Sequence, residues 1–506
     1  MPVAVLAALL GACGPEIVEE PFEPSASHQD YAEALSRLDL DETAMGTAWL
    51  AAAADALAAP AVVDTPFSEV ALIDPREPQA LGYEFVVRRG RAVTITVAAE
   101  VDRYFADLYR VDAEQRAAAG DRPDATDADD EPAEDPTAAP VPLGLTLVAS
   151  RPDDADRIRF EPRRDGRYVV RIQPELLRGG RFEVTIASTA SLSFPVEGAD
   201  PGDILSFYGD GRDGGIRKHE GVDIFAPRGT RLLAASDSLV ARVGQRDRGG
   251  NIVTLYDEER DLLLYYAHLE EQLVEQGTRV RRGDVIGTMG NSGNAITTPP
   301  HLHIGLYQGS WRYDVDPWDY FVDPPRTEPE PVRHADLVGA WARLAVEART
   351  SRRFPVPQPA PRWVNRNPLL RREGAGETMG ADAATDGPAE PAALSDGAER
   401  GVLQEAAATP VPTALPEETP VRVVGASGGL VRVALPGGGY GYLDPSSVTR
   451  DLPMVSVDTA RQVRDPATGD TFATVAAGVQ VAFVGRTGTR TYVALDDGRV
   501  GYFEGG

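Results

Sequence analysis

A short apolar run near the middle of the chain, PHLHIGL at residues 300–306, restricts how this region can fold. Side chains alternate between the two faces of a β-strand, so His301 and His303 share one face, and the other face carries Leu302, Ile304 and Leu306. The aliphatic face is expected to pack on a core, and the two imidazoles then project from the opposite side, about 6.6 Å apart at the backbone. An isolated pair of this kind also occurs on exposed edge strands, so the pair alone does not establish a functional site.

The composition excludes some classes of protein. The chain has 506 residues, which is enough for several domains, and a formal net charge of −28. A nucleic-acid-binding protein would carry a basic surface, whereas 42% hydrophobic residues with an acidic balance indicate globular domains joined by acidic linkers. We therefore expect no nucleic-acid partner.

The first residues, MPVAVLAALLGAC, form an apolar run that ends in small residues before Cys13, the only cysteine of the chain. This run is too short to span a bilayer as a stable helix and is typical of an export signal. Leu10-Gly11-Ala12 before Cys13 resembles a bacterial lipobox, which implies that residues 1–13 are a signal peptide and that Cys13 becomes lipid-modified. The absence of Lys or Arg before the run departs from that pattern and leaves open a signal without a lipid, or a structural N-terminus.

By analogy, Gly14 after the cysteine is compatible with sorting to the outer membrane. The resemblance thus implies an exported lipoprotein of the cell envelope, held in the outer membrane by its lipid and facing the periplasm.

The N-terminal half divides into two expected regions. Residues 28–60 are alanine-rich with helical spacing of the larger apolar residues, which predicts a helical segment that ends at Pro60. Residues 66–195 contain alternating strand patterns and are predicted to form a β-sandwich-like domain. An acidic insert at 114–140 interrupts this domain and is expected to be a surface loop.

Two further regions follow. Residues 201–325 are rich in glycine and β-branched residues, with frequent turns, and predict a compact all-β domain. Residues 326–412 are rich in proline, alanine and acidic residues, so we expect a linker with one helix at 335–348.

The C-terminal part, residues 413–506, contains an internal repeat. Residues 421–444 align without gaps on residues 481–504, an offset of 60, and share the pattern V-A-L followed by G-Y. This pattern resembles bacterial SH3-like modules, which implies tandem small β-barrels, although generic β-hairpins would also account for it. The expected fold class is therefore mainly β and multidomain: an N-terminal β-sandwich, a central all-β domain and the C-terminal repeats.

Upstream of the histidine pair, HEGVD places His219 and Asp223 four residues apart. In a straight strand their α-carbons would lie about 13 Å apart, so both can reach one ion only if the chain bends, which Gly221 allows. Two imidazoles and one carboxylate form a common catalytic zinc site, and His219, Asp223 and His303 would supply it. His268 ends another apolar run, so four of the six histidines fall within one predicted domain.

The motifs HEGVDIFAPRGT, YAHLE, GTRVRRGDVIGTMGNSGNA and PPHLHIGLY, in this order, resemble the lysostaphin-type (LytM-like) zinc metallopeptidases. The resemblance covers residues 201–325. It implies that one Zn²⁺ is held by His219, Asp223 and His303, and that His268 and His301 are the catalytic pair, with His301 nearer the attacking water. Other divalent ions fit the same ligand set.

The resemblance implies a zinc endopeptidase that hydrolyses peptide cross-bridges of peptidoglycan, with peptidoglycan and, through the lipid anchor, a membrane as its partners. One alternative is a non-catalytic relative that binds the wall or activates another hydrolase, although such relatives usually lack a metal ligand. The other is a zinc peptidase that acts on proteins.

Overall fold

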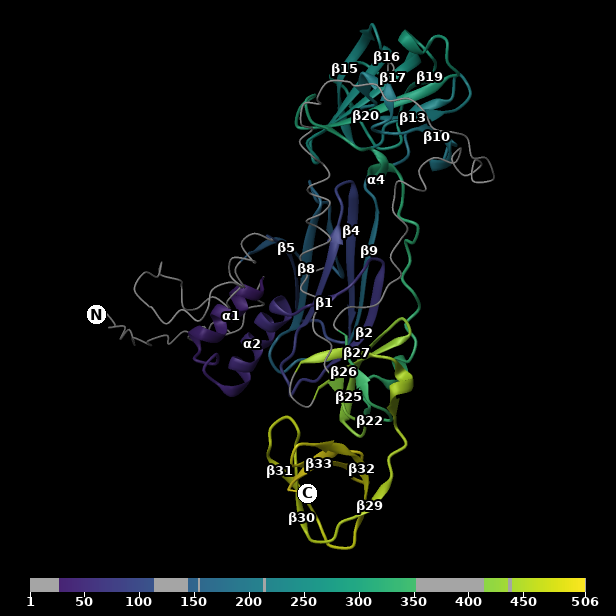
Figure 1. The fold of residues 1–506 in the computed structure, drawn as a ribbon. Helices are drawn as coiled ribbons and strands as arrows, with labels where there is room; N and C mark the ends of the chain where they lie inside the picture. The colour runs from purple at the N-terminus through teal and green to yellow at the C-terminus, as the bar shows by residue number, and fades with distance from the viewer. Residues whose placement is uncertain are drawn as a thin grey trace, which may run out of the picture.

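The computed structural model describes residues 27–112, 144–152, 155–212, 215–351, 414–435 and 439–505. The expected signal peptide with Cys13 and the acidic insert at 114–140 lie outside these ranges. The described part is mainly β and multidomain, and it is elongated, with one sheet domain at each end and a sandwich between them (Figure 1). No helix among the described residues has the length and apolarity to cross a membrane.

Two helices precede the sheets: α1 (His28–Arg37) and α2 (Ala44–Ala58). Ser27 and Thr43 cap their N-termini by accepting hydrogen bonds from backbone N–H groups two or three positions into each helix. Trp49 of α2 is buried, and its indole N–H donates to the carbonyl of Pro174 at 2.8 Å. These contacts hold the helices against the sandwich.

The N-terminal sandwich consists of two sheets that face each other around a shared apolar core. In spatial order, one sheet contains β1 (Ala61–Val62), β3 (Leu81–Val87), β8 (Gly166–Pro174), β5 (Tyr104–Val111) and β6 (Leu145–Ser150). The other contains β2 (Phe67–Ile73), β9 (Gly180–Ala190), β4 (Arg91–Ala99) and β7 (Arg157–Phe160). These strands lie within the predicted region 66–195, apart from β1.

The central domain is built on one large sheet with strand order β10-β13-β20-β17-β16-β15-β18. These strands are β10 (Ile204–Ser206), β13 (Val222–Phe225), β20 (His301–Gln308), β17 (Leu262–Gln272), β16 (Gly250–Asp257), β15 (Ser238–Arg246) and β18 (Arg279–Val280). The remaining elements are β14 (Arg231–Leu233), β19 (Val285–Met289), β21 (Asp314–Val315), the hairpin of β11 (Gly211–Arg212) with β12 (Arg217–Lys218), α4 (Trp318–Phe321), and 3-10 turns at Pro201–Asp203 and Gly293–Ala295.

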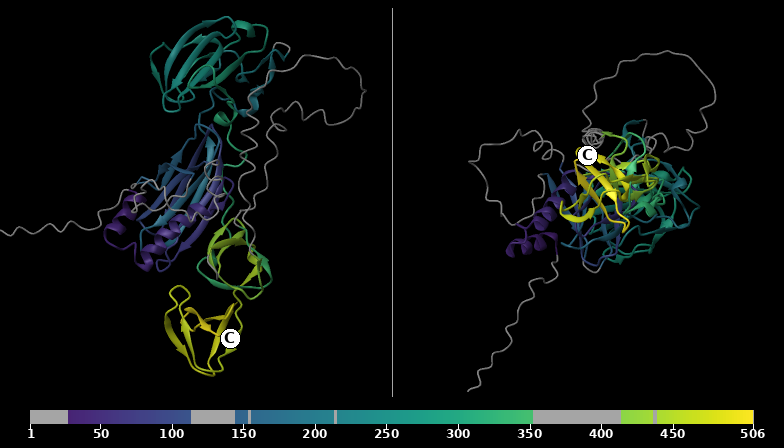
Figure 2. Two further views of the ribbon diagram at one scale, coloured as in Figure 1. Left: turned by 60° about the vertical axis from the view of Figure 1, so that its left-hand side comes forward. Right: turned by 90° about the horizontal axis from the view of Figure 1, so that it is seen from below.

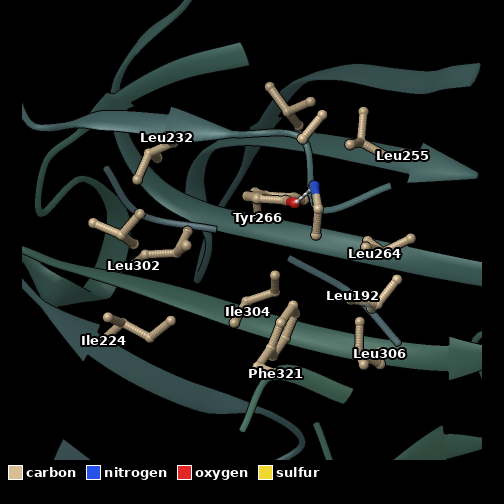
Figure 3. Close-up of a cluster of buried hydrophobic side chains, with 14 of the residues drawn as sticks. Leu192, Ile224, Leu232, Leu255, Leu264, Tyr266, Leu302, Ile304, Leu306 and Phe321 are labelled. Carbon is tan, nitrogen blue, oxygen red and sulfur yellow. Dashed lines mark hydrogen bonds between the residues drawn. The ribbon is translucent and has the colours of Figure 1, made fainter. Parts of the chain in front are cut away.

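The core of the central domain lies on one face of this sheet. Leu302, Ile304 and Leu306 are fully buried there, together with Leu264 and Tyr266 of the adjacent strand β17. Figure 3 shows these side chains packed together, with the Tyr266 hydroxyl accepting a hydrogen bond from the backbone N–H of Ala235. The predicted separation of aliphatic and histidine faces along PHLHIGL is confirmed, and the histidines project from the face opposite this core.

The C-terminal part forms two units whose strands repeat at the predicted offset of 60 residues. The first C-terminal unit contains β22 (Trp341–Leu344), β23 (Ala348–Arg349), β24 (Ala414–Leu415), β25 (Pro420–Ser427), β26 (Leu430–Ala434), β27 (Tyr440–Leu443) and β28 (Val448–Thr449), with 3-10 turns at Ala335–Leu337 and Pro445–Ser447. The second contains β29 (Met454–Ser456), β30 (Arg461–Arg464), β31 (Thr471–Val475), β32 (Gln480–Thr487), β33 (Arg490–Ala494) and β34 (Val500–Glu504).

The prediction of a helix at 335–348 is wrong. This segment forms a single 3-10 turn and then β22, which pairs with both β25 and β28. Ala342 and Leu344 are buried and alternate with partly exposed neighbours, so the period is two residues and not that of a helix. Sheet pairing overrides the helix propensity of the alanines, and the first unit begins inside the expected linker 326–412.

A buried ion pair joins the first C-terminal unit to the sandwich. Strand β25 pairs with β2, so one sheet continues from the sandwich into the first unit. Glu69 of β2 and Arg432 of β26 are both buried and lie 3.4 Å apart, and Glu69 also accepts hydrogen bonds from the hydroxyls of Tyr83 and Tyr442. This network fixes the first unit on the sandwich.

The second unit contacts the first through the same face that the first unit uses to contact the sandwich. A Cβ on Gly425 would lie 2.5 Å from a Glu69 carboxylate oxygen, and a Cβ on its repeat counterpart Gly485 would lie 2.2 Å from the Glu418 carbonyl. Tyr492, the counterpart of Arg432, lies against Trp341 of the first unit with ring centroids 5.9 Å apart. The units thus stack head to tail, and in Figure 1 and the left view of Figure 2 the second unit lies at the end opposite the central domain.

We predict that Glu69→Ala lowers the free energy of unfolding of the sandwich by about 3–5 kcal/mol, because it leaves Arg432 buried without a counter-charge. Arg490→Ala is the control, since it removes an exposed ion pair with Glu504 and is expected to cost less than about 1 kcal/mol. Urea unfolding followed by tryptophan fluorescence measures both. A Glu69→Ala protein as stable as the control contradicts the role of this pair.

Candidate functional site

The site is built on strand β20, which lies between β13 and β17 in the central sheet. Along β13, Asp223 is the direct cross-strand partner of His303, and Phe225 is the partner of His301. On the other side, Ala267 of β17 is the partner of His303. Because directly paired residues project from the same face, this register gathers the polar side chains on the face opposite the core.

Three side chains point their ligand atoms at one another. His219 Nε2 lies 2.9 Å from His303 Nδ1 and 3.1 Å from Asp223 Oδ1, and His303 Nδ1 lies 3.0 Å from the same Asp223 oxygen. Bonds of about 2.0–2.1 Å to a tetrahedral zinc ion separate ligand atoms by about 3.3 Å, so this triangle has the size of one face of such a site. The donor set of two imidazoles and one carboxylate therefore fits a zinc ion.

The backbone around His219 sets both its position and its tautomer. Its Nδ1 lies 2.9 Å from the carbonyl oxygen of Phe207, which can only accept, so Nδ1 carries the proton and Nε2 keeps its lone pair for a metal. Gly221 is required here because the chain passes close to β20: a Cβ would lie 2.4 Å from the Ile304 carbonyl and 2.8 Å from His303 Cε1. The glycine supplies space, and its φ is not in the left-handed region.

Arg212 holds the second oxygen of Asp223. Its guanidinium donates to Asp223 Oδ2 and to the hydroxyl of Ser206, each at 2.6 Å, which leaves Oδ1 directed at the two histidines. Burial raises the pKa of the Asp223 carboxyl, but the interactions with the His219 and His303 imidazoles outweigh burial and hold this pKa well below its usual range. Asp223 is therefore a carboxylate at neutral pH.

His268 and His301 form a second pair beside this triangle, with ring centroids 5.0 Å apart. His268 Nδ1 donates to the carbonyl of Ser292 at 2.8 Å, and His301 Nδ1 donates to the carbonyl of Pro299 at 2.9 Å. His301 also stacks on Phe225, with ring centroids 5.0 Å apart. Because a backbone carbonyl accepts the Nδ1 hydrogen bond of each ring, Nε2 is the nitrogen that can accept a proton in the neutral imidazole.

A local irregularity of β17 directs His268 toward the site. Asn251 pairs with Leu269 and Val253 with Tyr266, so β17 has one residue more than β16 at this point, which is a β-bulge. His268 lies in this bulge with φ of 68°, a left-handed conformation that non-glycine residues adopt rarely. Burial lowers the pKa of His268 to about 4, so its imidazole is neutral at pH 7.

The structure brings together all five residues selected from the sequence: His219, Asp223, His268, His301 and His303. Sequence reasoning missed Arg212. It lies in the hairpin of β11 and β12, eleven residues before Asp223, and no periodicity or spacing relates these two residues. The RDGG sequence was the available signal, since it predicts a turn, and β11 pairs with β12, which leads into His219.

Comparison with known proteins gives a family for part of the chain. Residues 217–317 match the family model described as peptidase family M23. All five site residues lie within this match. The resemblance drawn from the motifs is thereby confirmed for the central domain.

Individual relatives align with the same region. The chain is 39% identical over 90 residues to the peptidoglycan DD-endopeptidase ShyC of Vibrio cholerae, covering 18% of this chain and 20% of that protein. It is 35% identical over 125 residues to the L-Ala--D-Glu endopeptidase of Bacillus subtilis, covering 23% and 38%. The solved catalytic domain of lysostaphin from Staphylococcus simulans is 32% identical and covers 22% of this chain and 85% of that one, with a TM-score of 0.21. The chain thus spans well under half the length of the two curated relatives.

We predict that Arg212→Ala weakens zinc binding by roughly 10- to 100-fold without abolishing it, because the residue orients a ligand and is not itself one. Competition with a chromophoric chelator measures the affinity. Arg228→Ala is the matched control, since Arg228 pairs with Glu270 on the surface of the same domain. Equal affinities of the two variants would show that Arg212 does not position Asp223.

Proposed function

Because residues 217–317 of this chain are a domain of peptidase family M23, we propose that the protein is a zinc-dependent endopeptidase that hydrolyses peptide cross-links of peptidoglycan. The two curated relatives named above are both endopeptidases, and one carries peptidoglycan in its name. Their names specify different peptide bonds, so they leave the bond cut by this chain open.

The observation that carries the proposal is the mutual approach of three ligand atoms beside a pair of imidazoles. His219, Asp223 and His303 present one ligand atom each, all within 4.8 Å of one another. We propose that they hold a single zinc ion, since they are the one such group among the residues that the structure describes. When bound, zinc lowers the pKa of a water ligand and polarises the carbonyl of a scissile peptide bond.

The two remaining histidines supply proton transfer and charge stabilisation. In the neutral imidazoles their Nε2 atoms can accept a proton, because both Nδ1 atoms donate to backbone carbonyls. His301 lies two residues before the ligand His303 on the same strand face. We therefore assign it the role of accepting the proton of the attacking water. His268, across the site on β17, can stabilise the oxygen on which negative charge develops once its Nε2 carries a proton, because only then does Nε2 donate a hydrogen bond. A complete set of ligands and imidazoles disfavours a non-catalytic binding or activating role.

We also propose that the protein acts at the cell envelope. The lipobox-like sequence before Cys13 supports lipid modification there, which would tether the protein to a membrane, and outer-membrane sorting is the expected result of Gly14. The C-terminal units, as SH3-like modules, would contact the wall from the end of the molecule opposite the site.

We predict that His301→Ala retains zinc but loses roughly 10²- to 10⁴-fold of its peptidoglycan hydrolysis, the usual contribution of a positioned acid or base. His303→Ala is expected to lose both zinc and activity, because it removes a ligand. Metal content by mass spectrometry and fragments released from purified peptidoglycan measure the two properties.

Two results would contradict this division of roles. His301→Ala could lose zinc as readily as His303→Ala, which would make it a ligand. Alternatively, wild-type protein with one bound zinc could release no fragments from peptidoglycan, which would contradict the proposed function itself.

A further inference from the structure

A row of side chains leads away from the metal triangle across the same face of the central sheet. Arg242 of β15 is the cross-strand partner of Thr254 of β16, and Thr254 is the partner of Tyr265 of β17. Tyr265 is in turn the partner of Gly305 of β20, two residues beyond His303. Paired residues share a face, so this row connects the site to the β15 side of the domain.

An aromatic wall stands at the start of this row. The Tyr265 ring lies 6.1 Å from the ring of His303 and 5.6 Å from that of Trp311, and Trp311 lies 4.9 Å from Tyr307. Trp311 is 50% exposed although it is the largest type of apolar side chain. Exposed aromatic groups beside a catalytic centre offer a surface on which an extended substrate can pack.

The Tyr265 hydroxyl lies against the hairpin between β15 and β16. A Cβ on Gly249 would lie 2.1 Å from Tyr265 Oη, so only a glycine leaves room for the hydroxyl there. Within the described part of the chain this hydroxyl makes no hydrogen bond, and a phenol hydroxyl can donate one.

Two arginines lie on β15, one of the two strands of this hairpin. Arg242 and Arg246 are exposed and lie four residues apart on β15, and Arg242 Nε passes 3.9 Å from the Cβ position of Gly244 between them. Neither forms an ion pair with any residue in the described ranges, unlike Arg228, Arg231, Arg260 and Arg279 of the same domain. Both act electrostatically on Tyr265.

We propose that Arg242, Arg246 and the Tyr265 hydroxyl form a subsite that binds a free carboxylate of the substrate, so that the enzyme selects acidic peptide cross-links over uncharged ones. This inference rests on the proposed peptidase function and specifies its substrate class.

The chemistry of the three groups matches a carboxylate. A guanidinium donates two parallel hydrogen bonds to a carboxylate, and such charge-assisted bonds are about twice as strong as neutral ones. The unpartnered hydroxyl adds a third donor. A bridge made only of glycine residues carries no side-chain carboxylate and would leave all three donors without an acceptor.

The test compares two substrates that differ only in charge: a cross-linked peptide dimer released from peptidoglycan with free carboxylates, and the same dimer with those groups converted to carboxamides. Wild-type protein is expected to cleave the free acid with kcat/KM roughly 10- to 100-fold above that of the amide. Arg242→Gln with Arg246→Gln should bring the two values close together by slowing only the free acid. Tyr265→Phe should lower the free-acid value by about 2- to 10-fold.

Arg279→Gln is the matched control, because Arg279 is an exposed arginine of the same domain that already pairs with Glu258, in the turn after β16. It should leave the preference unchanged. Equal cleavage of both substrates by the wild type, or an unchanged preference in the double variant, overturns the subsite.

If the wild type cleaves neither substrate, the proposed function fails. The affinities of the two peptides, measured by calorimetry, then test the proposed subsite independently of cleavage. Tighter binding of the free acid by the wild type than by the double variant supports it, and equal binding overturns it.

Discussion

The position of β20 between β13 and β17 is the constraint on which the site depends. Its aliphatic side chains are fully buried in the core, so the strand cannot shift by one residue without turning Leu302, Ile304 and Leu306 toward solvent and both histidines into the core. The same register pairs His303 with Asp223 and with Ala267, the residue before the bulge that contains His268. Burial on one face thereby fixes the geometry on the other.

Backbone groups then complete what the register begins. Carbonyls of Phe207, Ser292 and Pro299 each accept a hydrogen bond from the Nδ1 atom of a different histidine, so three imidazoles have their tautomers set by the fold. Arg212 orients Asp223 in the same way from the carboxylate side. Ligands and proton acceptors that are held before a metal or substrate arrives need little reorganisation when it does.

Ion pairs join the outer parts of the molecule to one another. Glu161 of the sandwich and Arg260 of the central domain form an ion pair at 2.7 Å, and Arg91 and Asp319 form another at 2.6 Å. At the opposite end, Glu69 and Arg432 join the first C-terminal unit to the sandwich. The two C-terminal units each use one face for docking on the preceding module, so that face is not available to a ligand in either unit.

The sequence allowed much of this to be predicted where the signal was local. The alternation along PHLHIGL, the HEGVD spacing and the repeat at residues 421–444 and 481–504 all correspond to strands or contacts that the structure contains. What sequence reasoning missed depends on partners far along the chain. Arg212 has no spacing relation to Asp223, the His268 bulge exists only relative to β16, and β22 replaces an expected helix because β25 and β28 pair with it.

Anomalous diffraction at the zinc absorption edge, from crystals of the full chain, tests the central claim most directly. We expect one peak bonded to His219 Nε2, Asp223 Oδ1 and His303 Nδ1, with His268 and His301 outside bonding distance. A chain crystallised with zinc that shows no peak at these three atoms, or a peak ligated by His301 in place of His303, would contradict it.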